Sequence, residues 1–167
     1  MSFREFFCRH RATALVLGLG LGLGLVTGAL RAEVAQAPQV DAAALPALGK
    51  TWLAANPYRG QAAAETALAL GQAAYNQACA RCHGADASTN AAPAPDLRNL
   101  NRSCRRIADA ELKAWCLRDN DAYFAKTVRE GKIIVGVTHM PPWADILPQE
   151  LAWSIQLFFE AQAAAKR

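Results

Sequence analysis

The run Cys79-Ala80-Arg81-Cys82-His83 follows a stretch of helical periodicity near the middle of the chain. Two residues three apart on a helix lie on one face, about one turn from each other, so both thiols can reach the two vinyl groups along one edge of a porphyrin. The histidine after the second thiol then lies beneath the ring, where its imidazole can bind iron. The C-x-x-C-H run therefore predicts covalent haem attachment through Cys79 and Cys82, with His83 as an iron ligand.

Three other interpretations of the two thiols compete with haem attachment: a thioredoxin-like dithiol, a zinc site and a pair of structural thiols. A thioredoxin-like dithiol needs a βαβ context, whereas the surrounding pattern is helical. A zinc site needs a second closely spaced ligand pair, and Cys104 and Cys116 stand 12 positions apart. Two structural thiols would not explain the histidine that follows them, so haem is the favoured prediction.

Residues 1–32 have the pattern of a secretory signal peptide. Three arginines precede an uncharged run of 19 residues from Ala12 to Leu30, and Ala32 offers a small cleavage residue. The run is also long enough to span a bilayer, so an uncleaved anchor stays open. Five glycines weaken it as a permanent helix, which favours cleavage. The chain after about Glu33 is expected to be exported to the periplasm.

Length and composition narrow the class of protein. The chain has 167 residues, which is room for one domain with an extension. A hydrophobic fraction of 53% excludes an intrinsically disordered chain. The net charge of +4 derives mostly from residues 1–32, because 14 Lys and Arg face 13 Asp and Glu in the remainder. Nucleic-acid binding is therefore disfavoured.

Residues 33–60 form an Ala-rich extension in which prolines and glycines interrupt any long helix. The extension contains two aromatic residues, Trp52 and Tyr58. Terminal segments of this kind usually dock on their own domain, so burial of both rings is expected, with contact to a partner as the alternative.

The remaining chain, residues 61–167, predicts an all-α domain. A short apolar segment at 133–135 has strand character, but it is too short and isolated to found a sheet. Long loops are expected at 84–107 and 132–147. Helices are predicted at 61–78, at 108–117 (opened by Asp109 and carrying Leu112, Trp115 and Cys116 on successive turns), at 120–131 (with Gly131 as its stop), and from Pro148 onward.

A second iron ligand is predicted within Thr138-His139-Met140-Pro141-Pro142-Trp143. Beyond the signal, Met140 is the single methionine, and a thioether ligand raises the reduction potential relative to a second imidazole. Pro141 and Pro142 restrict the backbone beside it. His139 is interpreted as a surface residue that can replace Met140 if the thioether is displaced.

Two cysteines remain after haem attachment, because Cys8 belongs to the signal segment. In an oxidising compartment the remaining pair, Cys104 and Cys116, suggests a disulfide, with two buried reduced thiols as the alternative. A cluster of arginines lies nearby. The cluster consists of Arg98, Arg102, Arg105 and Arg106. It either steers an acidic partner, contacts the haem propionates or forms a solvated loop.

These motifs resemble those of class I c-type cytochromes over residues 61–164. The resemblance implies a single covalent haem c enclosed by helices. It also implies that Gly71 and Tyr75 pack across the last helix, facing some of Leu151, Ile155 and Phe158. The Pro95 carbonyl would hold the axial histidine, with Pro93 as the alternative, and Leu97 would lie against the ring.

A narrower resemblance is to periplasmic PedF-type cytochromes c. It rests on four segments of this sequence: Asn56–Gly60, Cys104 and Cys116 around Ala110–Lys113, Asp119–Phe124, and Val137–Pro141. The resemblance implies a non-enzymatic carrier that takes single electrons from a pyrroloquinoline-quinone (PQQ) alcohol dehydrogenase and passes them toward a terminal oxidase or another cytochrome. Two alternatives remain: a haem enzyme or gas-binding protein with an open sixth iron position, and a membrane-anchored haem subunit of a respiratory complex.

Overall fold

The computed structural model describes residues 35–87 and 94–165. The predicted signal peptide, Cys8 and Pro93 lie outside these residues. Glu33–Arg167 cluster as one compact unit, and its fold is mostly helical, as predicted. Within the described residues, no helix combines the length and apolar character needed to cross a bilayer.

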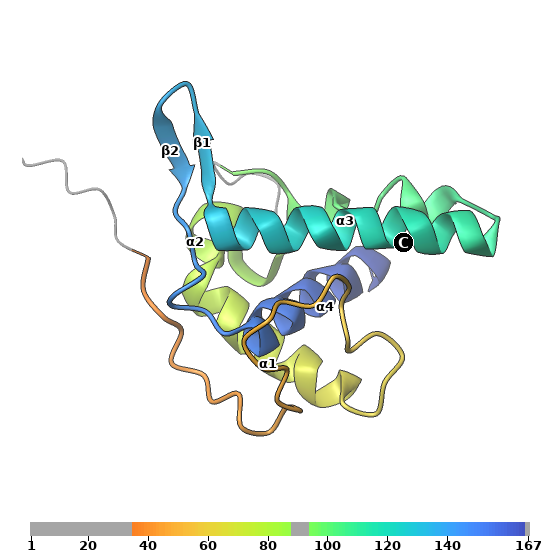
Figure 1. Ribbon diagram of the computed structural model, residues 1–167, viewed down its shortest axis with the longest axis horizontal. Helices are drawn as coiled ribbons and strands as arrows, with labels where there is room; N and C mark the ends of the chain where they lie inside the picture. The colour runs from red at the N-terminus through yellow and green to blue at the C-terminus, as the bar shows by residue number, and fades with distance from the viewer. Residues whose placement is uncertain (1–34, 88–93, 166–167) are drawn as a thin grey trace, which may run out of the picture. The chain divides into compact units, whose positions relative to one another are not determined.

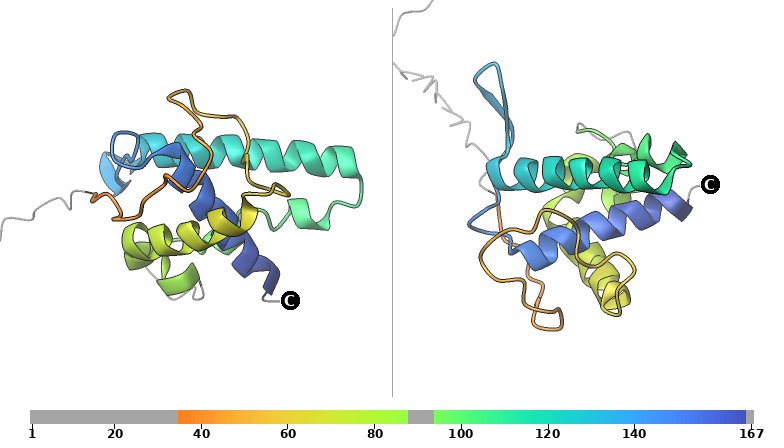
Figure 2. Two further views of the ribbon diagram at one scale, coloured as in Figure 1. Left: turned by 90° about the horizontal axis from the view of Figure 1, so that it is seen from below. Right: turned by 45° about the vertical axis from the view of Figure 1, so that its right-hand side comes forward.

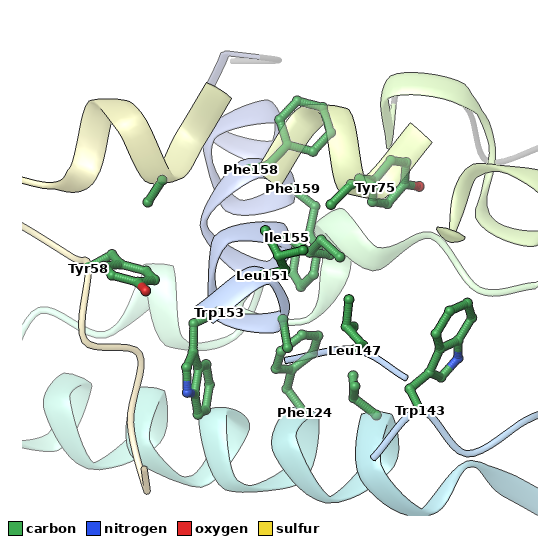
Figure 3. Packing of buried hydrophobic residues seen from close by; sticks show 14 of the residues in the cluster. Tyr58, Tyr75, Phe124, Trp143, Leu147, Leu151, Trp153, Ile155, Phe158 and Phe159 are labelled. Atoms are coloured by element: carbon green, nitrogen blue, oxygen red, sulfur yellow. The ribbon is translucent and has the colours of Figure 1, made fainter. Parts of the chain in front are cut away.

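The core forms where α1 (Ala64–Ala78) crosses α4 (Gln149–Ala165), as Figure 1 shows. A Cβ atom on Gly71 would overlap the backbone carbonyl of Ser154, so only glycine permits this close crossing. One turn further along α1, the ring of Tyr75 lies 5.3 Å from that of Phe158. Both contacts agree with the packing across the last helix that the resemblance implies, and Figure 3 shows the aromatic side chains of this core.

The two helices predicted at 108–117 and 120–131 form a single helix, α3 (Ala110–Glu130). Asp109 caps it as expected, accepting a hydrogen bond of 2.8 Å from the Leu112 amide, and Gly131 ends it. The predicted break at Asn120 and Asp121 was wrong because these side chains bind other elements instead of capping a helix. Leu112, Trp115 and Cys116 lie on this helix as predicted, and the side chains of Leu112 and Trp115 are both 58% exposed.

The loop predicted at 132–147 contains an antiparallel hairpin, β1 (Lys132–Ile134) and β2 (Val137–Met140). The apolar segment 133–135 therefore has a strand partner, and Val135 belongs to the turn. The sequence pattern does not indicate this partner, because β2 carries Thr138 and His139 instead of an apolar run.

The loop predicted at 84–107 contains three short 3₁₀ helices among its described residues. The first follows the haem motif, the second follows Pro95, and the third precedes α3. They are η1 (Ala85–Ala87), η2 (Leu97–Asn99) and η3 (Cys104–Arg106). A disulfide joins Cys104 to Cys116 with Cα atoms 5.6 Å apart, so η3 is attached to the first half of α3.

The extension docks on the helices, as predicted. Tyr58 is buried as expected, whereas Trp52 is only partly buried, with its ring 6.2 Å from that of Trp153 on α4. The side-chain amide of Gln149 donates to the carbonyl oxygens of Gly49 at 2.7 Å and Thr51 at 3.0 Å. The start of α4 is thus wrapped by the segment before α1.

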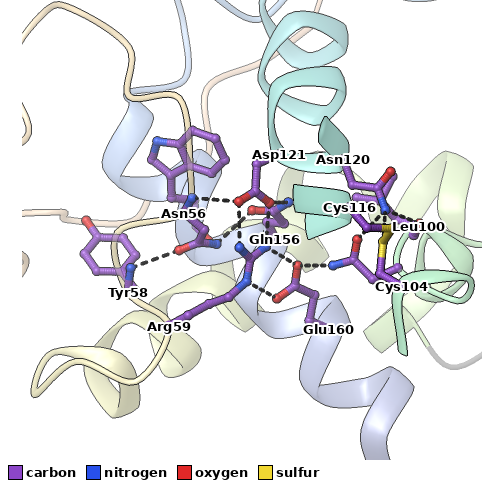
Figure 4. Close-up of polar contacts among 12 residues, drawn as sticks. Asn56, Tyr58, Arg59, Leu100, Cys104, Cys116, Asn120, Asp121, Gln156 and Glu160 are labelled. Carbon is purple, nitrogen blue, oxygen red and sulfur yellow. Dashed lines mark hydrogen bonds and ion pairs between the residues drawn. A yellow bond between two sulfur atoms is a disulfide. The ribbon is translucent and has the colours of Figure 1, made fainter. Parts of the chain in front are cut away.

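A buried polar cluster fastens the extension to α3 and α4 (Figure 4). The Asp121 carboxylate is fully buried and accepts hydrogen bonds of 2.6 and 2.5 Å from the two terminal nitrogens of Arg59. It also accepts from the Asn56 amide at 3.1 Å and from the Gln156 side chain at 2.7 Å. Arg59 reaches Glu160 on α4 as well, at 2.6 Å.

Candidate functional site

The C-x-x-C-H run forms the end of α1 and a short second helix, α2 (Ala80–His83). Cys79 caps α1, and its carbonyl accepts the His83 amide at 2.9 Å, which winds the run into one turn. Cys82 is exposed and Cys79 partly buried, and neither is in a disulfide. Two free thiols on one helical turn, followed by a histidine, match the donor set that covalent haem attachment needs.

The environment of Cys79 differs from that of a redox-active dithiol. Burial, together with the neighbouring Cys82, raises the pKa of the Cys79 thiol to about 12. Dithiol oxidoreductases instead lower the pKa of their attacking thiol so that the thiolate forms near neutral pH. The surroundings therefore favour haem attachment over the thioredoxin-like interpretation.

The His83 imidazole is oriented by a backbone carbonyl. Its Nδ1 atom lies 2.8 Å from the carbonyl oxygen of Pro95. This contact requires the proton on Nδ1, so the Nε2 lone pair is left for a metal ion. The partner is Pro95, as the resemblance implies. Leu97, two residues later, is partly buried and packs against the core.

Tyr75 fixes the chain just after the motif. Its hydroxyl donates to the carbonyl oxygens of His83 at 3.2 Å and Gly84 at 2.9 Å. Burial raises the pKa of Tyr75, so the hydroxyl keeps its proton. Gly84 turns the chain with φ of 87°, which suits glycine. The sequence indicated Tyr75 as a packing residue but gave no sign of its hydroxyl contacts.

Met140 ends β2 and packs, partly buried, against the core, whereas His139 is exposed. Two contacts fix the backbone around Met140. The Trp143 amide donates to the Val128 carbonyl on α3 at 2.9 Å. A Cβ atom on Gly131 would overlap the Met140 carbonyl oxygen and lie 2.8 Å from the Pro142 nitrogen. Sequence reasoning identified Gly131 as a helix stop and missed this close approach.

Three residues of the arginine cluster share one pocket. Arg98, Arg102 and Arg105 line a pocket of about 370 Å³ beside Ala163 of α4, with Asp96 and Asn99 as the other lining residues. Arg98 is buried and pairs with Asp96 at 2.8 Å. Neither the two free cysteines, nor His83, nor Met140 lines this pocket.

Comparison with known proteins identifies the family to which the chain belongs. Residues 66–158, more than half of the chain, match the family described as "Cytochrome C oxidase, cbb3-type, subunit III". The chain therefore belongs to the cytochrome c family. It is similar to the protein named "Cytochrome c550" of Pseudomonas aeruginosa, with 37% identity over 123 residues, 73% of this chain and 74% of the relative. No solved structure matches it significantly.

Family membership settles the general chemistry. The chain is a class I c-type cytochrome, an electron-transfer protein with covalently attached haem c and not an enzyme. The interpretations of the cysteine pair as a zinc or dithiol site are therefore set aside.

Proposed function

We propose that this cytochrome holds one haem c through thioether bonds from Cys79 and Cys82 and binds its iron with His83 and Met140. The observation that carries this assignment is the contact between His83 Nδ1 and the Pro95 carbonyl, which leaves Nε2 available in a C-x-x-C-H run. The haem supplies an iron ion that changes its charge by one electron. With His83 and Met140 as its ligands, the iron would favour the reduced state more than with two imidazoles.

The protein's own contribution is to hold both ligands in place through both redox states. The Pro95 carbonyl holds the His83 imidazole, and the Tyr75 hydroxyl holds the His83 backbone carbonyl. Gly131 and Trp143 fix the backbone around Met140. Ligands that do not move when the iron changes charge keep the reorganisation small, and a filled coordination sphere suppresses oxygen chemistry.

We propose a periplasmic location and a PQQ-dependent alcohol dehydrogenase as electron donor, with a terminal oxidase or another cytochrome as acceptor. The likeness of four segments to PedF-type cytochromes supports the donor. The signal pattern of residues 1–32 supports export, and so does the disulfide between Cys104 and Cys116, because disulfides persist in oxidising compartments.

A second candidate is a membrane-anchored haem subunit of a respiratory complex. The matching family, described as a subunit of a cbb3-type oxidase, favours it, as does the long apolar run before Ala32. Intact mass spectrometry of the exported protein separates the two candidates. A mature chain that starts near Glu33 and carries one haem supports the periplasmic carrier, whereas a retained N-terminus supports the anchored subunit.

Stopped-flow spectroscopy tests the proposed donor. Oxidised cytochrome is mixed with the substrate-reduced quinoprotein alcohol dehydrogenase of the same bacterium, and the haem bands report reduction. Ascorbate serves as the control reductant, because it needs no protein interface. Reduction by ascorbate without reduction by the dehydrogenase would contradict the proposed donor and leave the cytochrome assignment intact.

A further inference from the structure

The hairpin β1–β2 carries the most exposed apolar side chains in the described part of the chain. Val135 at its tip is 97% exposed and Ile133 is 68% exposed. The hairpin stands away from the helices in both Figure 1 and the right-hand view of Figure 2. Exposed apolar side chains gathered on one projecting element mark an interaction site more often than single surface residues do.

The turn of the hairpin has an unusual residue at its first position. Val135 has φ of 49° and Gly136 has φ of 75°, the left-handed pair of a two-residue hairpin turn. Asparagine or aspartate followed by glycine is preferred there, and a β-branched residue in this region is strained. Val135 does not contribute to packing, so we interpret its strained backbone as the cost of presenting an apolar side chain to another molecule.

Strand pairing divides the apolar residues between two faces. Ile134 pairs with Val137 on one face of the hairpin. The register shifts between Lys132 and Ile133, before the pair of Lys132 with Met140, so alternation does not place Ile134 and Val137 on the face of the proposed iron ligand. Ile133 pairs with Thr138 on the opposite face. Ile133 and the tip residue Val135 are the two most exposed of these apolar side chains, at 68% and 97%, compared with 48% for Ile134 and 59% for Val137.

The base of the hairpin is positively charged. Residues 126–140 contain three cations, Lys126, Arg129 and Lys132, and one carboxylate, Glu130. Glu130 is exposed and lies 3.9 Å from Lys126. The Lys132 ammonium is exposed and donates to the Tyr123 hydroxyl at 2.8 Å. An apolar tip above a cationic base is complementary to an apolar recess with an acidic rim.

We propose that Ile133 and Val135 form the apolar anchor by which this cytochrome docks on its redox partner proteins, each offering an apolar recess edged by carboxylates. The inference rests on the proposed carrier function. β2 connects the anchor directly to Met140, and its four residues span about 13 Å, so docking at the tip brings the partner to the side of the proposed iron ligand.

The test compares holo-protein carrying Ile133→Thr and Val135→Asn with wild type. Threonine suits the strand at position 133 and asparagine suits the left-handed backbone at position 135, and both substitutions remove the apolar surface. The control variant is Leu112→Gln, which removes a 58% exposed apolar side chain from the other end of α3. Rates are measured for reduction by the quinoprotein dehydrogenase and for oxidation by membranes of the same bacterium.

We expect the double variant to react about tenfold more slowly in at least one of these two reactions, while its haem spectrum and its reduction by ascorbate stay unchanged. Leu112→Gln should react as wild type does. Lys132→Gln should slow the same reaction and flatten its dependence on ionic strength. Equal rates for the double variant and wild type in both reactions would overturn the inference.

The two arms separate this inference from the proposed donor. If the dehydrogenase does not reduce the wild-type protein, the proposed donor is wrong. If the double variant is then oxidised more slowly than wild type by the membranes, the docking role of Ile133 and Val135 still stands. Sedimentation of wild type, but not of the double variant, with protein-free vesicles of anionic phospholipid would assign the hairpin to a lipid surface and overturn the docking of proteins. If only Leu112→Gln slows the reactions, the docking surface lies on α3, and this result would also overturn the inference.

Discussion

Gly131 and Met140 approach each other so closely that the backbone at Gly131 has no space for a side chain. A Cβ atom there would overlap the Met140 carbonyl oxygen and lie 2.8 Å from both the Pro141 carbonyl carbon and the Pro142 nitrogen. All of these atoms belong to the backbone, so no side-chain rotation relieves the overlap. The end of α3 thus sets where the proposed thioether ligand lies.

Gly131→Ala is therefore expected to displace Met140. The substitution should weaken the charge-transfer band that reports methionine bound to ferric iron and lower the free energy of unfolding by about 2–4 kcal/mol. Gly49→Ala is the matched control, because Gly49 has a similar φ of 79° but open space around it. The control should lose only about 1 kcal/mol and keep the band. An intact band in Gly131→Ala would contradict the prediction.

Met140→Ala should open the sixth coordination position. Reduced variant protein is expected to bind carbon monoxide immediately on mixing, whereas reduced wild type should not, and the reduction potential should fall with loss of the thioether. His139→Ala serves as control and should keep the wild-type spectrum. A double variant lacking both side chains shows whether His139 replaces the thioether. Carbon monoxide binding to wild type at the rate of Met140→Ala would refute Met140 as ligand.

Asp121→Ala should destabilise the fold through the buried cluster. The substitution leaves Arg59, Asn56 and Gln156 without their shared acceptor. We expect a loss of about 2–4 kcal/mol in urea unfolding, less than for a fully enclosed pair because the Arg59 side chain is 25% exposed. Glu130→Gln on the same helix breaks only an exposed pair and should change stability by about 0.5 kcal/mol or less. Similar losses for both variants would disprove the prediction.

Cys104→Ala combined with Cys116→Ala should cost about 2–3 kcal/mol of unfolding free energy, because the loop between them is short. The haem spectrum should be unchanged, since neither sulfur belongs to the motif. Adding a thiol reductant should destabilise wild type to the level of the double variant and leave the variant unaffected. A reductant effect on the variant would show that the loss came from another source.

Val135→Asn should stabilise the protein by about 1 kcal/mol, because asparagine tolerates the left-handed backbone that strains valine. Val137→Asn is the comparison, since Val137 lies in a strand and should show no such gain. Thermal unfolding measures both. A destabilised Val135→Asn would show that the valine packs within the fold.

Local features of the sequence predicted much of the site. The C-x-x-C-H spacing and the Asp109 cap each act within a few residues, so a linear pattern contains them, whereas the packing of Gly71 across α4 was expected only from the resemblance. The contact between Pro95 and His83 was accessible only through resemblance to a family. Nothing in the spacing of the two residues indicates that a carbonyl 12 positions away faces the imidazole.

The errors arose where distant residues determine local structure. Asn120 and Asp121 have the composition of a helix cap, but Asn120 donates to the Leu100 carbonyl at 2.9 Å and Asp121 binds Arg59. Tertiary partners therefore let both residues continue α3. The hairpin was missed because pairing between Ile133 and Thr138 depends on a turn that a valine normally disfavours.

The contacts between Asn56 and Gln156 and between Arg59 and Glu160 join positions 100 and 101 residues apart, with the haem motif between them. The segment from Asn56 to Arg59 therefore cannot complete its native contacts until the final helix has been synthesised. A premature stop shortly before residue 156 would release both ends of the molecule at once, and such a fragment should be degraded even though its C-x-x-C-H run is complete.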